Sequence, residues 1–314
     1  MTGKIILKRV AFGIPLLFVV SIITFVLVAL SPGDAARVLA GPDATQADYE
    51  SLRQQLGLND PLPVQYWHWL VGAMHGNLGH SIVNGSDVAQ SLNERLGVTL
   101  SLVILATIIS GVIGILVGSV SAHRGGMLGK IVDVGAIAGF ALPHFWIGLI
   151  LVTLLAVQLR LFPALGYVNL SSSPELWLRS VSLPVLTLVI GGVAGIAKQT
   201  RDAMLNGLGA EYTVAHRADG VPERSVVYRH VLRNSASPIL AVVGLHFVGT
   251  LSGTVLVEQI FGLPGLGSLA VSATNQHDIP VIQGIALYFG ILVVLVNLVL
   301  DLVYRRLNPK VDVS

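Results

Sequence analysis

Long apolar stretches separated by short polar ones dominate the chain. A helix that crosses the hydrocarbon core of a bilayer needs about 20 mostly apolar residues. Six segments meet that length and composition; their approximate bounds are Val10–Leu30, Leu96–Ala122, Ile131–Leu159, Val181–Thr200, Ile239–Val257 and Val281–Val303. The pattern therefore predicts an all-α, polytopic membrane protein with six transmembrane helices.

The first apolar segment has two interpretations. Lys4, Lys8 and Arg9 precede it, as basic residues precede the apolar core of a signal peptide. Its apolar run is longer than the roughly 7–15 residues of such a core, and no small-residue cleavage site follows at once. We therefore expect a retained first span.

The basic residues are distributed unevenly between the two sides that six spans define. If both termini lie on one side, the other side keeps only Arg37, Arg53, Arg95, Arg160 and Arg179 of the 19 Lys and Arg residues. The positive-inside rule then predicts that both termini are cytoplasmic.

Two polar segments interrupt the apolar pattern. With this orientation, residues 31–95 form an extracytoplasmic loop, which contains a predicted short helix at Ala47–Leu56 and a chain break at Pro61-Leu62-Pro63. Residues 201–237 form a cytoplasmic loop. A plain connection between helices needs only about 2–8 residues, so the cytoplasmic loop is expected to have a function of its own.

Composition supports a membrane protein and excludes several other classes. Hydrophobic residues make up 53% of the 314 residues and charged residues 11%, whereas soluble domains carry about 25% charged residues. A soluble enzyme and a disordered chain are therefore excluded. The chain has no cysteine, so it can form neither disulfides nor metal sites with thiolate ligands. The net charge of +2 gives no indication of nucleic-acid binding, and no such partner is expected.

Motifs for catalysis, metal binding and nucleotide binding are missing from the sequence. Gly129-Lys130 lacks the upstream glycine of a phosphate-binding loop, because Arg124 stands at that position. Neither an H-E-x-x-H nor a G-x-S-x-G pattern occurs. We expect no catalytic residue, no metal and no cofactor in this chain.

Ionisable side chains within spans are unfavourable in free energy, so their presence there indicates a functional role unless another explanation is found. Glu258 lies near an outer end, where it is expected to reach the interface. His246 lies deeper and either lines a substrate path or makes a helix–helix hydrogen bond. We expect His144, His246 and Glu258 as candidates for a translocation path. The spans contain no paired carboxylates, which argues against an ion-coupled carrier, so a partner is expected to supply the energy.

Within the cytoplasmic loop, the sequence pattern predicts a short helix over residues 211–220. Gly220 is expected to end this helix, and Pro222 follows it. Tyr212, Ala215 and Ala218 are spaced i, i+3, i+6, so they share roughly one face, and we expect this face to nest into a groove of a cytosolic partner. A second, basic helix is predicted over Glu223–Asn234. The alternative is that this basic helix lies on anionic lipid.

These residues resemble the EAA loop of the membrane subunits of ATP-binding-cassette (ABC) importers. Gly220 and Ala215 match the glycine and the first alanine of that loop, whereas Val214 and His216 replace its glutamate and second alanine. The peptide branch of the family is closer, with Y-x-x-x-A-R-A-K-G followed by R-H-x-L-R-N. This sequence has Tyr212, Arg217, Ala218 and Gly220, then Arg229-His230-Val231-Leu232-Arg233-Asn234. It departs from the pattern at His216, which replaces the alanine, and at Asp219, which replaces the usual lysine.

The resemblance extends over nearly the whole chain. Further matching segments are Ser31-Pro32-Gly33-Asp34, Leu56–Pro61, Gly76–Ser81, Leu142–Leu149, Phe162–Tyr167, Val257–Gly267 and Asn308-Pro309. In this order and on this topology, they are similar to the first permease subunit of dipeptide/oligopeptide/nickel-type importers.

The resemblance implies a type I importer permease fold in the bacterial cytoplasmic membrane. It implies four kinds of partner: a second homologous permease, two ATPase subunits that bind ATP and Mg, an extracytoplasmic binding protein facing residues 31–95, and the lipid bilayer. It implies ATPase coupling through Tyr212, Ala215, Arg217, Ala218, Asp219 and Gly220.

The substrate implied by the resemblance is a short peptide. A nickel complex, glutathione, haem or an oligosaccharide stays open as the alternative. A secondary carrier and a channel or receptor are the rival classes. A secondary carrier would need a coupling carboxylate within the membrane and would work without a partner ATPase.

Overall fold

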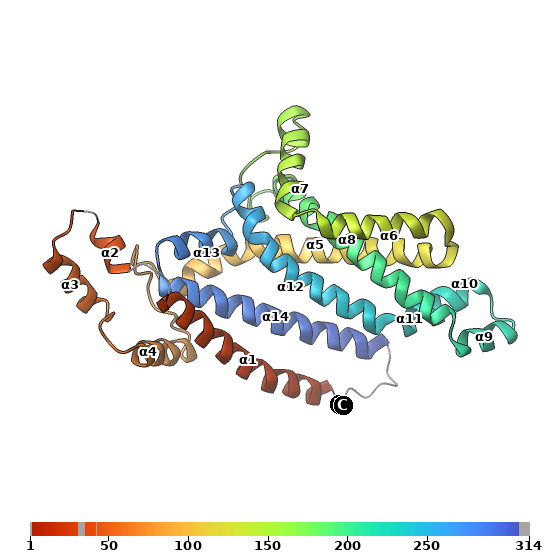
Figure 1. Cartoon of the computed structure of the whole chain (residues 1–314), viewed down its shortest axis with the longest axis horizontal. Helices are drawn as coiled ribbons and strands as arrows, with labels where there is room; N and C mark the ends of the chain where they lie inside the picture. The colour runs from red at the N-terminus through yellow and green to blue at the C-terminus, as the bar shows by residue number, and fades with distance from the viewer. Residues whose placement is uncertain (1, 31–34, 42, 308–314) are drawn as a thin grey trace. The chain divides into compact units, whose positions relative to one another are not determined.

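The computed structural model describes residues 2–30, 35–41 and 43–307, and these residues form helices connected by loops (Figure 1). The motifs Ser31-Pro32-Gly33-Asp34 and Asn308-Pro309 lie outside the described residues. The chain divides into two compact units. The first unit comprises residues 3–99 and 264–294, and the second comprises residues 100–263 and those from 295 onward.

The first unit holds the amino-terminal span and the extracytoplasmic segment predicted from the sequence. Its helices are α1 (Thr2–Leu30), α2 (Ala35–Ala40), α3 (Gln46–Gln55), α4 (Leu62–Met74), the start of α5 (Val88–Arg124), α13 (Leu266–Asn275) and most of α14 (Ile279–Leu307). Thr45 and Asp48 form a capping box that starts α3, which confirms the short helix predicted there. The Pro61-Leu62-Pro63 segment separates α3 from α4, and its prolines stand where α4 begins, a position that tolerates them.

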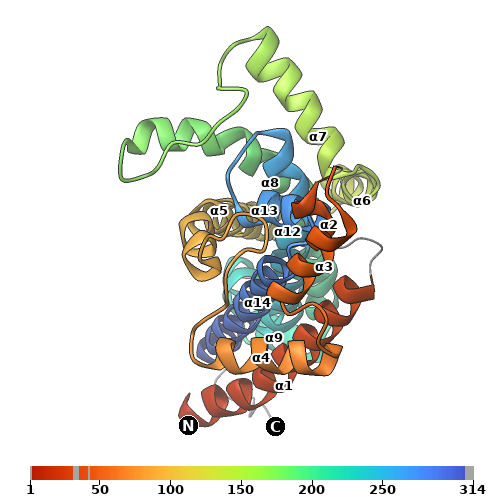
Figure 2. The same ribbon diagram turned by 90° about the vertical axis from the view of Figure 1, so that its left-hand side faces the viewer.

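Helix α4 packs against the first span. Figure 2 shows α4 crossing next to α1, where the Tyr66 hydroxyl lies 2.8 Å from Ser21 Oγ and the Tyr66 ring lies 5.5 Å from that of Phe25. Buried apolar residues between α5, α13 and α14, including Leu92, Leu266 and Ile285, form the core of this unit. Tyr66 of α4 therefore contributes to packing against the first span.

The second unit contains the remaining spans. They are the rest of α5, α6 (Gly126–Ala141), α7 (His144–Leu151) continued by the π-helical segment η1 (Val152–Gln158), α8 (Pro174–Leu208), α12 (Ala236–Ile260) and the end of α14. Helix α8 is central and packs against α6, α7 and α12 (Figure 1).

Glycines allow the helices of the second unit to approach closely. A Cβ atom on Gly118 of α5 would lie 2.4 Å from the Ala197 carbonyl oxygen of α8, and one on Gly139 of α6 would lie 2.6 Å from Ala194 Cβ. Small residues at such contacts bring helix backbones together and increase van der Waals packing in a bilayer.

Ion pairs also connect α6 to α8. Asp133 of α6 pairs with Lys198 at 3.2 Å and with Arg201 at 3.1 Å, both on α8.

Five uninterrupted helices of the described residues are long and apolar enough to cross a membrane, and a bent pair makes a sixth. The pair comprises α6 and α7–η1, whose directions differ by 98° across Leu142-Pro143. The single helix predicted over Ile131–Leu159 is therefore broken. Pro143 has no backbone N–H to donate, and it biases Leu142 toward the extended conformation that the structure shows.

The spans expose large apolar side chains, as lipid-facing helices do. Exposed examples on successive spans are Leu27, Leu116, Ile137, Ile190, Leu245 and Val299. In water such a surface would be an aggregation hazard, whereas acyl chains solvate it.

Candidate functional site

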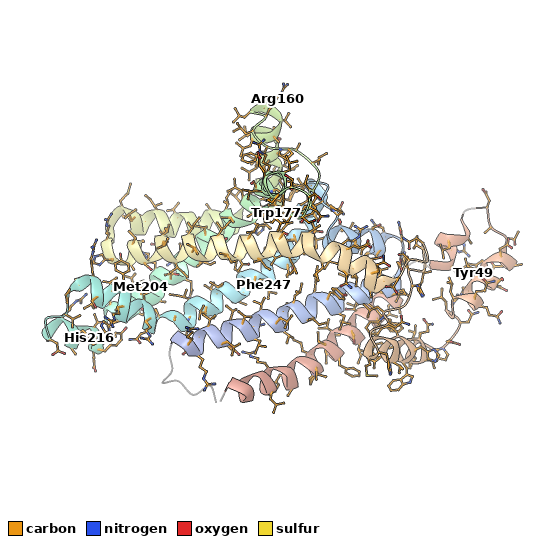
Figure 3. All side chains as sticks on the ribbon, turned by 180° about the vertical axis from the view of Figure 1, so that it is seen from behind. Tyr49, Arg160, Trp177, Met204, His216 and Phe247 are labelled. Atoms are coloured by element: carbon orange, nitrogen blue, oxygen red, sulfur yellow. The ribbon has the colours of Figure 1, made fainter. Side chains whose placement is uncertain are left out.

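The loop expected to dock a partner forms a helical layer at one end of α8. It consists of α9 (Glu211–Ala218), α10 (Glu223–Ser225), the π-helical segment η2 (Val226–Val231) and α11 (Leu232–Asn234). Met204 of α8 is completely buried there, together with Val226, Val227 and Val231. Figure 3 shows Met204 and His216 of α9 at this same end.

Two residues at the start of α9 anchor it to the end of α8. Thr213 is completely buried, and its hydroxyl donates a hydrogen bond of 2.7 Å to the Gly207 carbonyl. A Cβ on Gly207 would lie 2.9 Å from the Tyr212 hydroxyl and 2.9 Å from Val231 Cγ1. The absence of a side chain at Gly207 thus makes room for α9. Neither Thr213 nor Gly207 is marked by the sequence pattern, because their roles depend on the packing of α9 against α8.

The end of α9 has the geometry of a Schellman motif. The N–H of Gly220 donates to the Arg217 carbonyl at 3.1 Å, and the N–H of Val221 donates to the His216 carbonyl at 3.0 Å. Gly220 has φ +74°, in the left-handed region that glycine adopts without steric cost. The helix stop predicted at Gly220 is confirmed.

The exposed face of α9 differs from the face predicted. Val214, Ala215 and Ala218 are exposed, while Tyr212 is half-buried and packs against the cluster around Met204. Tyr212 therefore anchors the helix, and the free small-residue face runs through Val214, Ala215 and Ala218. The helix presents this face because Tyr212 and Thr213 hold its opposite side.

The basic helix that follows does not have a free apolar face. Val226, Val227 and Val231 are completely buried against the chain's own helices. An amphipathic helix on a lipid surface needs those apolar residues for insertion. The alternative in which this helix lies on anionic lipid is therefore weakened.

A bidentate ion pair spans the turn at Gly220. Arg217 Nη2 lies 2.7 Å from Glu223 Oε1, and Arg217 Nε lies 3.0 Å from Glu223 Oε2. The hydrogen bond from Arg217 lowers the pKa of Glu223, and the same bond raises the pKa of Arg217. The pair links the end of α9 to the start of α10, and Asp219 is exposed beside it.

Two histidine rings stack between α9 and η2. The ring centroids of His216 and His230 are 4.2 Å apart, with an interplanar angle of 35°. Loss of hydration at the ring, and then the neighbouring His216 and Arg229, lower the pKa of His230. The folded loop therefore favours the neutral imidazole.

We expect the loop to become less stable in acid. A histidine with a lowered pKa contributes stability above its ordinary value of about 6.5, and this contribution is lost as the pH falls through the lower folded value. Hydrogen–deuterium exchange of residues 211–231, corrected for intrinsic rates, should therefore be faster at pH 5.5 than at pH 7.5. His230→Phe keeps a ring in the stack and should remove most of this difference; an unchanged difference would contradict the assignment.

The three candidate path residues do not form one site. His144 begins α7 and lies against Gly191, while His246 of α12 lies against the next residue, Gly192. A Cβ on Gly192 would be 2.3 Å from the His246 ring and 2.6 Å from Ser110 Oγ. Glu258 lies twelve residues after His246 on α12, which is roughly 18 Å along a helix. The structure thus brings the two histidines to adjacent glycines of α8 and leaves Glu258 apart.

Glu258 does not reach an interface, contrary to the sequence-based expectation. Its exposed fraction is 0%. A buried carboxyl on a span is costly, so it has a structural or functional role within the packed helices.

No group of three or more His, Cys, Asp or Glu side chains within the described part of the chain could hold a metal ion.

Comparison with known proteins identifies the family. The family model described as "Binding-protein-dependent transport system inner membrane component" matches residues 110–313, and the model of its N-terminal part matches residues 2–103. The probable peptide ABC transporter permease protein y4tP of Sinorhizobium fredii is 37% identical over 310 residues, covering 98% of this chain and 99% of that protein. The oligopeptide transport system permease protein AppB of Bacillus subtilis is 37% identical over 314 residues, covering 98% of each chain.

A solved structure supports the fold. An inward-facing structure of the MetNI methionine ABC transporter superimposes with a TM-score of 0.52 at 15% sequence identity, covering 69% of this chain and 96% of that chain. Membership of this family implies a membrane, ATPase partners and a substrate-binding partner, and it requires no cofactor on the permease itself. The chain belongs to the binding-protein-dependent transport system inner membrane components and is a multi-pass ABC importer permease of the cytoplasmic membrane, a transport subunit rather than an enzyme.

Proposed function

We propose that this chain forms part of the translocation path for short peptides in an ATP-driven importer. In this proposal, α9 is the element through which movement of the ATPase subunits is transmitted to the spans. The observation that carries the proposal is α9 itself. It is fixed by Thr213 and Tyr212, ends in a Schellman motif, and leaves Val214, Ala215 and Ala218 exposed. A rigid helix with small exposed side chains suits a groove on a moving partner, because it transmits displacement without absorbing it.

The complete assembly would contain a second homologous permease, two ATPase subunits that bind ATP and Mg, and an extracytoplasmic binding protein that meets residues 31–95. ATPase closure would move the loop 201–237, and Ala215, Arg217, Ala218, Asp219 and Gly220 would contact the ATPase. Tyr212 would act by holding α9 in place. The path would pass the helices that carry His144, His246 and Glu258.

The choice of peptide as substrate rests on the relatives, since y4tP is described as a peptide permease and AppB as an oligopeptide permease. Competition distinguishes the alternatives. In proteoliposomes of the full assembly, uptake of a labelled dipeptide should be inhibited by unlabelled peptides and not by nickel, haem or an oligosaccharide.

Reconstitution separates an ATP-driven importer from a secondary carrier. The full assembly with its binding protein should transport labelled peptide only when ATP is present on the side of the membrane that holds the ATPases. The chain reconstituted alone should not transport on a proton or sodium gradient. Gradient-driven uptake by the chain alone would overturn the proposal.

The orientation of the two loops has its own test, which the cysteine-free sequence makes simple. Asn84 and Arg224 are exposed positions in the proposed extracytoplasmic and cytoplasmic loops. Asn84→Cys should react with an impermeant maleimide in intact spheroplasts, and Arg224→Cys only after permeabilisation. The reverse labelling pattern would invert the topology.

A further inference from the structure

Helix α4 carries an apolar face that remains exposed among the described residues. Val64 is 39% exposed, Trp67 59% and Met74 66%. Trp67 follows Val64 by three positions and Met74 follows Trp67 by seven, a spacing that places all three on one side of an α-helix. An exposed apolar stripe of this kind marks a surface that another apolar phase or molecule covers.

The neighbouring side of α4 is polar and faces the loop that precedes the helix. Gln65 Nε2 donates to the Asp60 carbonyl at 2.8 Å and to the Leu58 carbonyl at 3.4 Å. His68 lines, together with Gln65 and Asp60, the cavity between this loop and α4. Successive residues of an α-helix are about 100° apart, so His68 lies on a different side from Trp67. The exposed surface of α4 is therefore divided along its length into an apolar part and a polar part.

Contacts with α1 place α4 beside the apolar part of that span, as Figure 2 shows. The centroid of the Tyr66 ring lies 6.3 Å from that of Phe18 and 5.5 Å from that of Phe25, and both phenylalanines belong to the span Ala11–Leu30. At about 1.5 Å of rise per residue, Phe25 is roughly 7 Å and Phe18 roughly 18 Å from the end of α1 at Leu30. Half of the hydrocarbon core is about 15 Å thick. Helix α4 is therefore at the level of the acyl chains on that side of the membrane.

The charges of α3 and α4 differ in the way that contact with water and contact with lipid require. Helix α4 contains no Asp, Glu, Lys or Arg, whereas α3 contains Asp48, Glu50 and Arg53. A charged side chain among acyl chains is unfavourable, while tryptophan is favoured at the boundary between acyl chains and headgroups. The composition of α3 therefore suits water, and that of α4 suits the membrane.

We propose that α4 is an interfacial helix, which lies in the bilayer with Val64, Trp67 and Met74 against acyl chains and with Gln65 and His68 toward the extracytoplasmic loop. Amphipathic helices bind membrane interfaces in this orientation. Because α4 has no Lys or Arg, the contact depends on apolar burial and not on anionic lipid. The assignment goes beyond the proposed function and holds whatever the substrate is. It removes this face of α4 from the surface that a binding protein could reach.

Spin labels on single cysteines test this orientation in the assembled transporter in nanodiscs, and the cysteine-free sequence makes each label unique in this chain. Labels at Trp67→Cys and Met74→Cys should be more accessible to oxygen, which concentrates among acyl chains, than to a water-soluble nickel chelate. A label at His68→Cys should show the opposite order. The pattern should be the same in phosphatidylcholine nanodiscs with and without phosphatidylglycerol, since α4 has no basic Lys or Arg.

Two further positions calibrate the labels. Ile23 of α1 is 52% exposed and lies between Phe18 and Phe25, so Ile23→Cys should give the oxygen-accessible pattern of a lipid-facing position. Gln54 of α3 is exposed, so Gln54→Cys should give the chelate-accessible pattern of a position in water. All the labelled side chains are exposed, so the labels do not disturb a packed core.

Tryptophan fluorescence gives a second measurement that needs no label. Quenching by brominated lipid should fall more in Trp67→Phe than in Trp69→Phe, because Trp69 is half-buried and its ring lies 6.1 Å from that of Tyr66. Equal losses of quenching in the two variants would contradict the orientation.

Two results of the labelling experiment would overturn the proposal. Labels at positions 67 and 74 that are more accessible to the chelate than to oxygen would mean that this face lies in water. Labels there with low accessibility to both reagents would mean that another protein covers the face. Protection that appears only after the binding protein is added would identify that protein as the partner.

Discussion

Replacing Ala215 by tryptophan is expected to abolish ATP-driven uptake by the assembled transporter while its subunits stay folded and associated with the membrane. Ala215 is exposed on α9, and its neighbours on that face are Val214 and Ala218. An indole at this position would hold the partner surface away from the helix. Because a few central contacts carry most of the energy of an interface, we expect at least about a tenfold loss of uptake.

The readouts are peptide uptake and ATPase activity in the same proteoliposomes. ATP hydrolysis should no longer respond to the binding protein, because the two processes are uncoupled. Asn206→Trp is the matched control, since Asn206 is exposed near the end of α8 and lies outside α9. Normal uptake by the Ala215→Trp variant would show that this face of α9 does not dock an ATPase.

Gly220 allows a second test of the same surface. Gly220→Trp should leave assembly largely intact and uncouple transport from ATP hydrolysis. Because φ at Gly220 is +74°, any side chain there adds backbone strain of about 1–2 kcal/mol, so Gly220→Ala measures the strain alone. A Cβ at this position meets no described atom within 4 Å. The alanine variant therefore adds strain without a clash within the described part of this chain. The tryptophan variant adds a bulky side chain on the surface that faces the partner, so it should lose more uptake than the alanine variant.

The second large effect concerns helix packing. Gly118→Ala should destabilise the protein by about 1–3 kcal/mol, the usual cost of overpacking. The new Cβ would lie 2.4 Å from the Ala197 carbonyl oxygen and 2.7 Å from Thr200 Cβ. The carbonyl belongs to the backbone of α8, so it can move only if α8 moves relative to α5.

Gly111→Ala on the same helix is the control, because its Cβ would meet no described atom within 4 Å outside the helix's own backbone. The control should be neutral or stabilised by up to about 1 kcal/mol, since alanine favours helix more than glycine does. Thermal unfolding of purified assemblies should place Gly118→Ala below the unaltered protein. Equal melting temperatures for the two variants would refute the close contact between α5 and α8.

The predictable features were those that depend on residues near each other in the chain. The apolar lengths predicted the spans, and the glycine at 220 with the proline at 222 predicted the end of α9. Thr45 and Asp48, three residues apart, account for the short helix α3 through a capping box. Each of these depends on local hydrogen bonding or on the partition of one helix into lipid, so no distant part of the chain is needed.

The sequence by itself thus determined the membrane class, the number of apolar segments and the position of the helix stop at Gly220. The tertiary structure alone decided that Glu258 is buried and that Tyr212 is an anchor. Membrane spans are apolar on nearly all faces, so periodicity does not show which face packs against protein and which against lipid. That choice depends on helices distant in sequence, such as α5 and α8 where Gly118 meets Ala197, and it exists only once they are packed.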